Sequence, residues 1–85
     1  MDLDVKVTHE PACTRVLVAG ASSLGRLSSL MQVLEVDSTT WPHKEVVLDL
    51  RRLESRLDRA EREMLQQVAE RRLRSKRVEM LWPQR

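Results

Sequence analysis

Two short runs of consecutive apolar residues constrain the fold of this chain more than any other feature. Residues 16–19 read VLVA and residues 46–48 read VVL, and both runs are apolar on successive rather than alternate positions. Such runs are typical of central parallel strands that are covered on both faces, or nearly so. Between them, apolar residues recur every three or four positions, which predicts a helix over residues 24–34 with Ser22 or Ser23 as its N-cap.

The other predicted elements complete a small α/β domain. Residues 3–8 alternate between apolar and polar side chains, which predicts a strand near a sheet edge, joined antiparallel to the next strand by a short turn. A second helix is predicted from about Arg56 to about Lys76, a last strand over residues 77–82, and a loop over residues 36–43. The predicted fold class is therefore α/β: a small four-stranded mixed sheet with two helices, mainly on one face, in the order β-β-α-β-α-β, as a single domain over residues 1–85.

The second helix carries signals at its start and along one face. Ser55 followed three residues later by Asp58 resembles a capping box, with Asp in place of the preferred Glu. Its predicted buried face consists of apolar residues at helical spacing: Leu57, Ala60, Met64, Leu65, Val68, Ala69 and Leu73. These signals make it the clearest element of the sequence.

The composition argues against several classes of function. A chain of 85 residues has room for one core and little else, which counts against an enzyme with a deep cleft. Fifteen basic and 13 acidic residues nearly cancel, and with two Trp but neither Phe nor Tyr the chain lacks platforms for base stacking. The single cysteine, Cys13, cannot form an intramolecular disulfide, and no segment reads as a signal peptide or a membrane span. We therefore expect a cytoplasmic, non-enzymatic protein without membrane insertion.

The motifs that suggest ligand chemistry are incomplete. Residues 16–26 read VLVAGASSLGR, and Gly20 and Gly25 have the spacing of a phosphate-binding loop, but the Lys-Ser/Thr pair that should follow is absent. The glycine pattern of dinucleotide-binding dehydrogenases is incomplete too, so we predict a strand-to-helix turn and no cofactor, with weak anion binding left open. His9, His43 and Cys13 cannot complete a four-ligand zinc site, so no metal site and no catalytic residue is predicted.

One family resemblance rests on the third strand and the second helix. Residues 46–50, VVLDL, lead into the long amphipathic helix, and together with the order of elements they resemble a STAS domain, the anti-sigma-factor-antagonist family. In that family a Leu-Asp-Ser-Ser-Gly motif opens the helix, and a partner kinase phosphorylates its second serine. Here the motif falls on residues 57–61, LDRAE, where Leu57 and Asp58 match and Ala60 stands at the acceptor position. The resemblance implies a shortened, degenerate member without the phosphoserine switch, unless Ser55 has replaced it.

The resemblance and the lack of catalytic residues predict a regulatory or adaptor domain that binds another protein, such as a regulator or a kinase-like factor. The predicted partner-binding residues follow the third strand, open the second helix and end the last strand: Arg51, Arg52, Ser55, Arg56, Arg59 and Trp82. Two alternatives stay open. One is a nucleic-acid-binding domain that uses the arginine-rich second helix, and the other is a small enzyme or ligand-binding domain that uses the loop from Gly20 to Gly25; a second copy of the chain is also a candidate partner.

Overall fold

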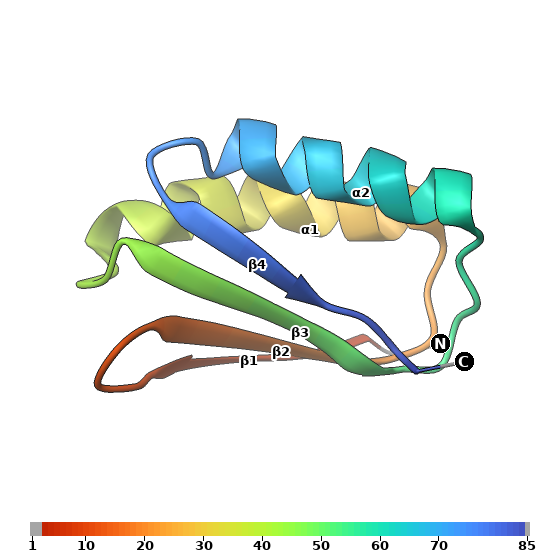
Figure 1. The fold of residues 1–85 in the computed structure, drawn as a ribbon, viewed down its shortest axis with the longest axis horizontal. Coiled ribbons are helices and arrows are strands. Elements are labelled where there is room, and N and C mark those ends of the chain that lie inside the picture. The colour runs from red at the N-terminus through yellow and green to blue at the C-terminus, as the bar shows by residue number, and fades with distance from the viewer. Residues whose placement is uncertain (1–2, 85) are drawn as a thin grey trace.

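The computed structural model describes residues 3–84 and contains a four-stranded mixed sheet with two helices (Figure 1). The elements are β1 (Leu3–His9), β2 (Thr14–Gly20), α1 (Leu24–Asp37), β3 (Glu45–Leu53), α2 (Arg59–Arg72) and β4 (Arg77–Leu81), with a short 3-10 helix, η1 (Ser38–Thr40), after α1. This arrangement confirms the predicted α/β class and the order β-β-α-β-α-β. Neither helix is long and apolar enough to cross a membrane, as far as residues 3–84 are concerned.

The strands lie in the order β1-β2-β3-β4, so β1 forms one edge of the sheet, as predicted, and β4 forms the other. β1 pairs antiparallel with β2, whereas β2, β3 and β4 run parallel to one another. In this register Leu17 lies beside Asp49, and the pairing shifts between Leu17 and Ala19, so that Ala19 lies beside Arg52. The irregularity therefore places Arg52, rather than Arg51, beside Ala19 of β2.

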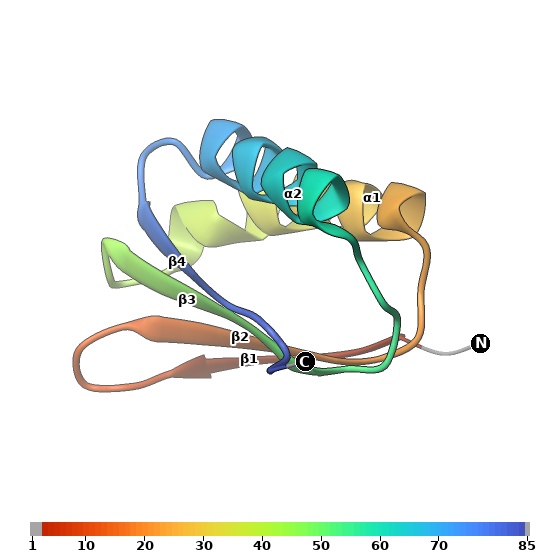
Figure 2. The ribbon, with the colours of Figure 1, turned by 45° about the vertical axis from the view of Figure 1, so that its right-hand side comes forward.

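Both helices cover the same face of the sheet, and Figures 1 and 2 show the sheet as the second layer beneath them. Side chains at alternate positions of the central strands point into the space between the layers, because successive residues of a strand face opposite sides. Val16 and Val18 of β2 and Leu48 of β3 are fully buried there. They pack with Leu27 and Leu65 of the two helices in a single core.

α1 begins as predicted and runs further than predicted. Ser23 is its N-cap, because its hydroxyl accepts a hydrogen bond from the Arg26 amide. The prediction of a loop over residues 36–43 was wrong for residues 36–40, which belong to α1 and η1. The hydroxyls of Ser38, Thr39 and Thr40 each donate to a carbonyl three residues earlier, which extends the helical path.

α2 begins at Arg59, three residues later than predicted. Asp58 is the N-cap: its carboxylate accepts from the Glu61 amide, while the Glu61 carboxylate accepts from the Asp58 amide. The capping box thus uses the preferred Glu at its third position. The predicted capping box of Ser55 with Asp58 was wrong, because Ser55 lies outside the helix.

The buried side of α2 is narrower than the sequence pattern suggests. Leu65 and Ala69 are buried, and Leu73 is buried just after the helix. Ala60 and Met64 were wrongly predicted for this side: both are exposed, and 53% of Met64 is accessible. Leu57 and Val68 are partly buried and pack against the same core, so five of the seven predicted residues meet it.

Candidate functional site

The face of the sheet opposite the helices, here called the uncovered face, holds the strand residues that alternate with the core. Its apolar members are only half-buried: Leu17 and Ala19 of β2, Val47 of β3 and Leu81 of β4. Within residues 3–84, no helix or strand packs on this face. The helices thus lie on one face of the sheet, as predicted, whereas the coverage of both faces that is typical of such apolar runs is not found within residues 3–84.

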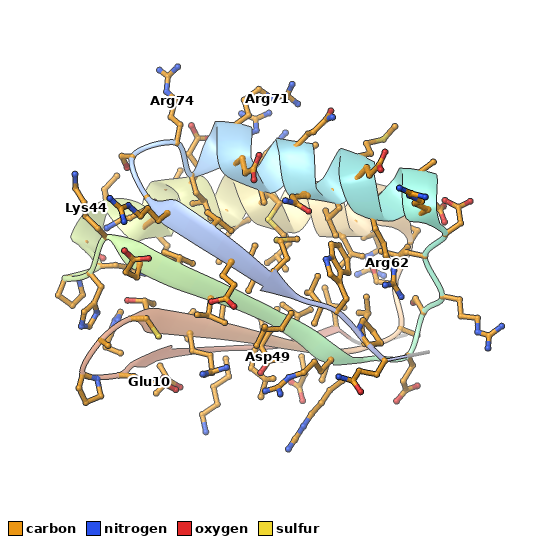
Figure 3. The ribbon with its side chains drawn as sticks, in the orientation of Figure 1. Glu10, Lys44, Asp49, Arg62, Arg71 and Arg74 are labelled. Atoms are coloured by element: carbon orange, nitrogen blue, oxygen red, sulfur yellow. The ribbon has the colours of Figure 1, made fainter. Side chains whose placement is uncertain are left out.

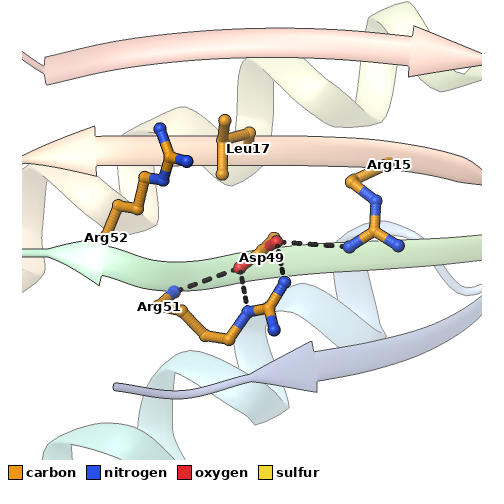
Figure 4. A pocket seen from close by; sticks show the side chains of 5 residues that line it. All are labelled: Arg15, Leu17, Asp49, Arg51 and Arg52. Carbon is orange, nitrogen blue, oxygen red and sulfur yellow. Dashed lines mark hydrogen bonds and ion pairs between the residues drawn. The ribbon is translucent and has the colours of Figure 1, made fainter. Parts of the chain in front are cut away.

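An ion cluster built around Asp49 lies at the centre of the uncovered face (Figures 3 and 4). Arg51 donates to this carboxylate from its side chain, from Nε at 2.9 Å and from Nη2 at 2.8 Å, and its amide donates at 3.2 Å. Arg15 of β2 adds a further hydrogen bond, from Nη1 at 3.2 Å. The Asp49 side chain is only 5% exposed, although no helix or strand of residues 3–84 covers it, because the two arginine side chains shield it from water.

The electrostatics of the cluster follow from these contacts. Hydrogen bonds from the Arg51 side chain, together with its amide and charge, lower the pKa of Asp49 from 3.8 to about 2. In return, Asp49 raises the pKa of Arg51. Arg15 is held mainly by Glu10, whose carboxylate accepts from Nε at 2.8 Å; this contact raises the pKa of Arg15 and lowers that of Glu10. All four groups are therefore charged near neutral pH.

Two adjoining hollows on the uncovered face share Leu17 and Arg52. The first has a volume of about 460 Å³ and is lined by three arginines, Leu17 and Asp49, so its lining carries a net charge of +2. Figure 4 shows the Arg52 side chain extending from β3 toward Leu17 of β2. The second hollow, of about 360 Å³, continues toward β1 and is lined by Asp4, Val5, Lys6, Leu17, Ala19 and Arg52. Together they form a shallow depression with an apolar floor and a basic rim.

The structure divides the predicted partner-binding residues among separate places. Arg51 and Arg52 line the first hollow of the uncovered face. Arg56 lies in the loop between β3 and α2, and Arg59 is the first residue of α2, with 93% of its side chain exposed. Trp82 is half-buried against the core, and the Arg62 guanidinium lies 5.3 Å from its ring centroid. The six predicted residues therefore do not form one site.

Ser55, the remaining predicted residue, fastens two loops at the carboxyl ends of β2 and β3. Its hydroxyl accepts a hydrogen bond of 2.6 Å from the Ser22 amide, and the adjacent Glu54 amide donates to the Gly20 carbonyl at 2.7 Å. Gly20 has a φ of 101°, a conformation that glycine adopts far more readily than other residues. A hollow of about 370 Å³ beside this junction is lined by Leu53, Glu54, Ser55, Arg56, Leu57, Asp58, Arg62 and Pro83. Two acidic and two basic side chains balance there, so the hollow has no net charge.

The histidines and the cysteine lie at the opposite end of the strands. The Thr14 Oγ atom lies 3.0 Å from His9 Nδ1 and 3.3 Å from His43 Nδ1, and Thr14 is fully buried. Partial burial and the neighbouring Glu10 raise the pKa of the Cys13 thiol, which disfavours the reactive thiolate. Residues 3–84 contain no group of three or more His, Cys, Asp or Glu side chains placed to hold a metal ion.

Comparisons with known proteins identify the fold without assigning a family. No protein-family model matches the chain, and no curated protein matches it. Eight chains of solved structures match it. One is the crystal structure of Mglu in its native form, with a TM-score of 0.61 and 20% sequence identity; the match covers 92% of this chain and 23% of the Mglu chain. At this identity the likeness shows the fold alone. Our chain spans about a quarter of the length of the Mglu chain.

Arg15, Leu17 and Asp49 were not among the site residues predicted from the sequence. The signal was present in the alternation of β3, because Asp49 stands between Leu48 and Leu50, both of which are buried in the core. A charged residue at that position must face away from the core. The partner of Asp49 on β2 could not be read in the same way, since it depends on the register of two parallel strands.

Proposed function

We propose that this chain is a regulatory or adaptor domain that binds another protein, and that the partner packs on the uncovered face. One observation carries the proposal: the central strands have the apolar pattern of strands buried on both faces, yet the helices bury only one face. Leu17 and Val47 contribute to apolar runs typical of strands buried on both sides, yet both remain half-buried. A partner on this face would remove them from water, which favours association.

The ion cluster makes the same face suitable for specific recognition. Asp49 holds Arg15 and Arg51 in fixed positions, so less side-chain entropy is lost when a partner contacts them. Arginine is enriched in protein interfaces because it combines a planar donor group with an apolar stem. The resemblance to the anti-sigma-factor-antagonist family supports a regulatory role for such an interaction.

The distribution of arginines weighs against the nucleic-acid alternative. Figure 3 shows Arg71 and Arg74 beyond the helices, on the opposite side of the molecule from Asp49. The arginines at the end of β3 and those around the end of α2 therefore do not converge on one surface. The uncovered face also carries acidic side chains near its arginines, among them Asp4 and Glu79, which would repel phosphates.

The test is to place a photo-crosslinking amino acid at position 47, on the uncovered face, and at position 71, on the outer side of α2. We expect a protein adduct of defined mass from position 47 and none of the same mass from position 71. The adduct should persist after nuclease treatment and should disappear when Leu17→Glu is added, provided that circular dichroism shows this variant to be folded. An adduct from position 71 alone would refute the proposed face, and loss on nuclease treatment would favour nucleic acid.

Two further variants test whether Arg56 and Arg59 also contact the partner, and the mass of the adduct tests for a homodimer. Arg56→Glu and Arg59→Glu change the loop and the start of α2 without altering the uncovered face. If they abolish the adduct at position 47 as strongly as Leu17→Glu does, the interface extends to that end of the sheet. An adduct with twice the mass of the chain would identify a second copy as the partner, and light scattering over a concentration series would check it.

A further inference from the structure

We infer that the partner reaches the uncovered face with an acidic segment, whose carboxylates bind Arg51 and Arg52 while an apolar side chain packs on Leu17. This inference rests on the proposed function and specifies the chemistry of the occupant. It depends on which donor groups of the two arginines remain available once the internal ion cluster has formed.

Arg51 keeps one edge of its guanidinium for a partner. It donates to Asp49 from Nε and Nη2, and no acceptor within residues 3–84 is found for Nη1. A guanidinium can bind one carboxylate along its Nε edge and a second along its terminal edge, because its five donors lie in one plane. The Arg51 side chain is 56% exposed, so the second carboxylate can approach from solvent.

Asp49 does not compete for that second position. Its Oδ1 atom accepts from the Arg51 amide and Nε, and its Oδ2 atom accepts from Arg51 Nη2 and Arg15 Nη1. Both oxygens are therefore occupied, and their charge is shared between two arginines. Asp49 orients Arg51 and leaves its terminal edge without an acceptor in the part of the chain that the structure describes, which suits recognition of a planar anion.

Arg52 supplies a second cation next to an apolar surface. It is exposed and lines both hollows, and it forms no ion pair within residues 3–84. Leu17 and Ala19 form the floor beside it. A segment that combines carboxylates with an apolar residue would satisfy both features, whereas a purely anionic polymer would leave the apolar floor exposed.

The experiment is to select a random peptide library displayed on phage against the immobilised chain and to compare the selected peptides with the input library. We expect enrichment of Asp and Glu beside an apolar residue, and depletion of Lys and Arg. Synthetic copies of the selected peptides should bind at least roughly tenfold more weakly to Arg51→Gln and to Arg52→Gln, since each variant loses a charge-assisted contact. Arg71→Gln is the matched control: it removes the same charge from an exposed arginine on the far side of the helices and should not change the affinity.

The outcomes separate this inference from the proposed function. Selected peptides that lose affinity on Leu17→Glu but show no acidic enrichment, or no dependence on Arg51 and Arg52, would overturn the inference and leave the proposed function standing. If no selected peptide depends on any residue of the uncovered face, both fail. A labelled DNA duplex is the second probe, and binding of the duplex that needs Arg51 and Arg52, with no dependence of any peptide on them, would also overturn the inference.

Discussion

The two faces of the sheet are built from the same strands but are stabilised by different interactions. On the helix-covered face, Val16, Val18 and Leu48 are fully buried, and packing against apolar helix residues stabilises them. On the uncovered face, Leu17 and Val47 stay half-buried, and the buried side chain is the charged Asp49. One face is thus held by apolar contacts and the other by an ion cluster that remains open to solvent at its arginines.

From this difference we expect the helix-covered face to determine the stability of the fold, and the uncovered face to determine partner binding. Burial of apolar surface supplies most of the free energy of folding, so substitutions on the helix-covered face should unfold the chain. Exposed guanidinium groups contribute little to stability but can contribute much to binding, because a partner removes them from water. Variants of the two faces should therefore differ in which measurement they change.

The largest effect should come from truncating a core leucine. Leu48→Ala leaves a cavity beneath both helices, and we expect a loss of about 3 kcal/mol in the free energy of unfolding. Leu17→Ala removes the same atoms from the uncovered face and should cost about 1 kcal/mol, since Leu17 is only half-buried. Urea denaturation of both variants measures the two values. Equal losses would mean that the uncovered face is already covered in solution, for instance by a second copy.

The second effect concerns the ion cluster and depends on pH. The pKa of Asp49 falls from 3.8 to about 2 on folding, so its charged form stabilises the fold by about 2 kcal/mol at neutral pH. Because the folded-state pKa is the lower one, this contribution is present above about pH 4 and is lost as the pH falls toward 2. Asp49→Asn should therefore be less stable than the wild type at pH 7 and equally stable near pH 2. Urea denaturation at several pH values measures the difference.

Asp4→Asn is the control for that titration. Asp4 lies on the same face but is exposed, and no ion pair links it to another residue within residues 3–84. Its substitution should change stability little, at neutral or at acid pH. If Asp49→Asn differs from the wild type by the same amount at every pH, the carboxylate acts through its shape rather than its charge, and the electrostatic account of the uncovered face is wrong.

The elements of the fold were predictable because their signals are local. Alternation in β1, apolar runs in β2 and β3, and helical spacing in α1 identified the class and the order of elements. The predicted start of α2 was wrong because two residues could each serve as its N-cap. Ser55 and Asp58 are both good N-caps, and the structure uses Asp58 because Ser55 accepts a hydrogen bond from Ser22, 33 residues away in the sequence.

The candidate site was predictable only in part, for a similar reason. Arg51 and Arg52 were selected from the sequence, yet the residue that orients Arg51 is Asp49, which Arg15 also contacts. Arg15 and Asp49 are 34 residues apart, and their contact depends on the parallel register of β2 and β3. The burial of the uncovered face was unpredictable for the same reason. An apolar run predicts that a sheet face is buried, but it does not say whether the same chain or a partner buries it.

A smaller effect should come from the junction at the carboxyl ends of β2 and β3. Ser55→Ala removes the acceptor of the Ser22 amide and leaves that amide without its partner in the loop, which should cost about 1 kcal/mol. Thermal unfolding measures the change, and Ser29→Ala, whose exposed hydroxyl bonds only within its own helix, is the control. If Ser55→Ala is as stable as Ser29→Ala, the two loops are not fastened by this contact and can move independently of the sheet.

The smallest effect should come from the exposed start of α2, which contrasts most with both faces of the sheet. Arg59 pairs with Glu63 at 3.6 Å, and their side chains are 93% and 65% exposed. Such a pair contributes less than about 0.5 kcal/mol, and a cation in the first turn also opposes the helix dipole. Arg59→Gln should therefore leave the urea midpoint nearly unchanged. If it nevertheless weakens partner binding as much as Arg52→Gln does, recognition extends beyond the uncovered face to the β3–α2 end, which was also predicted to bind.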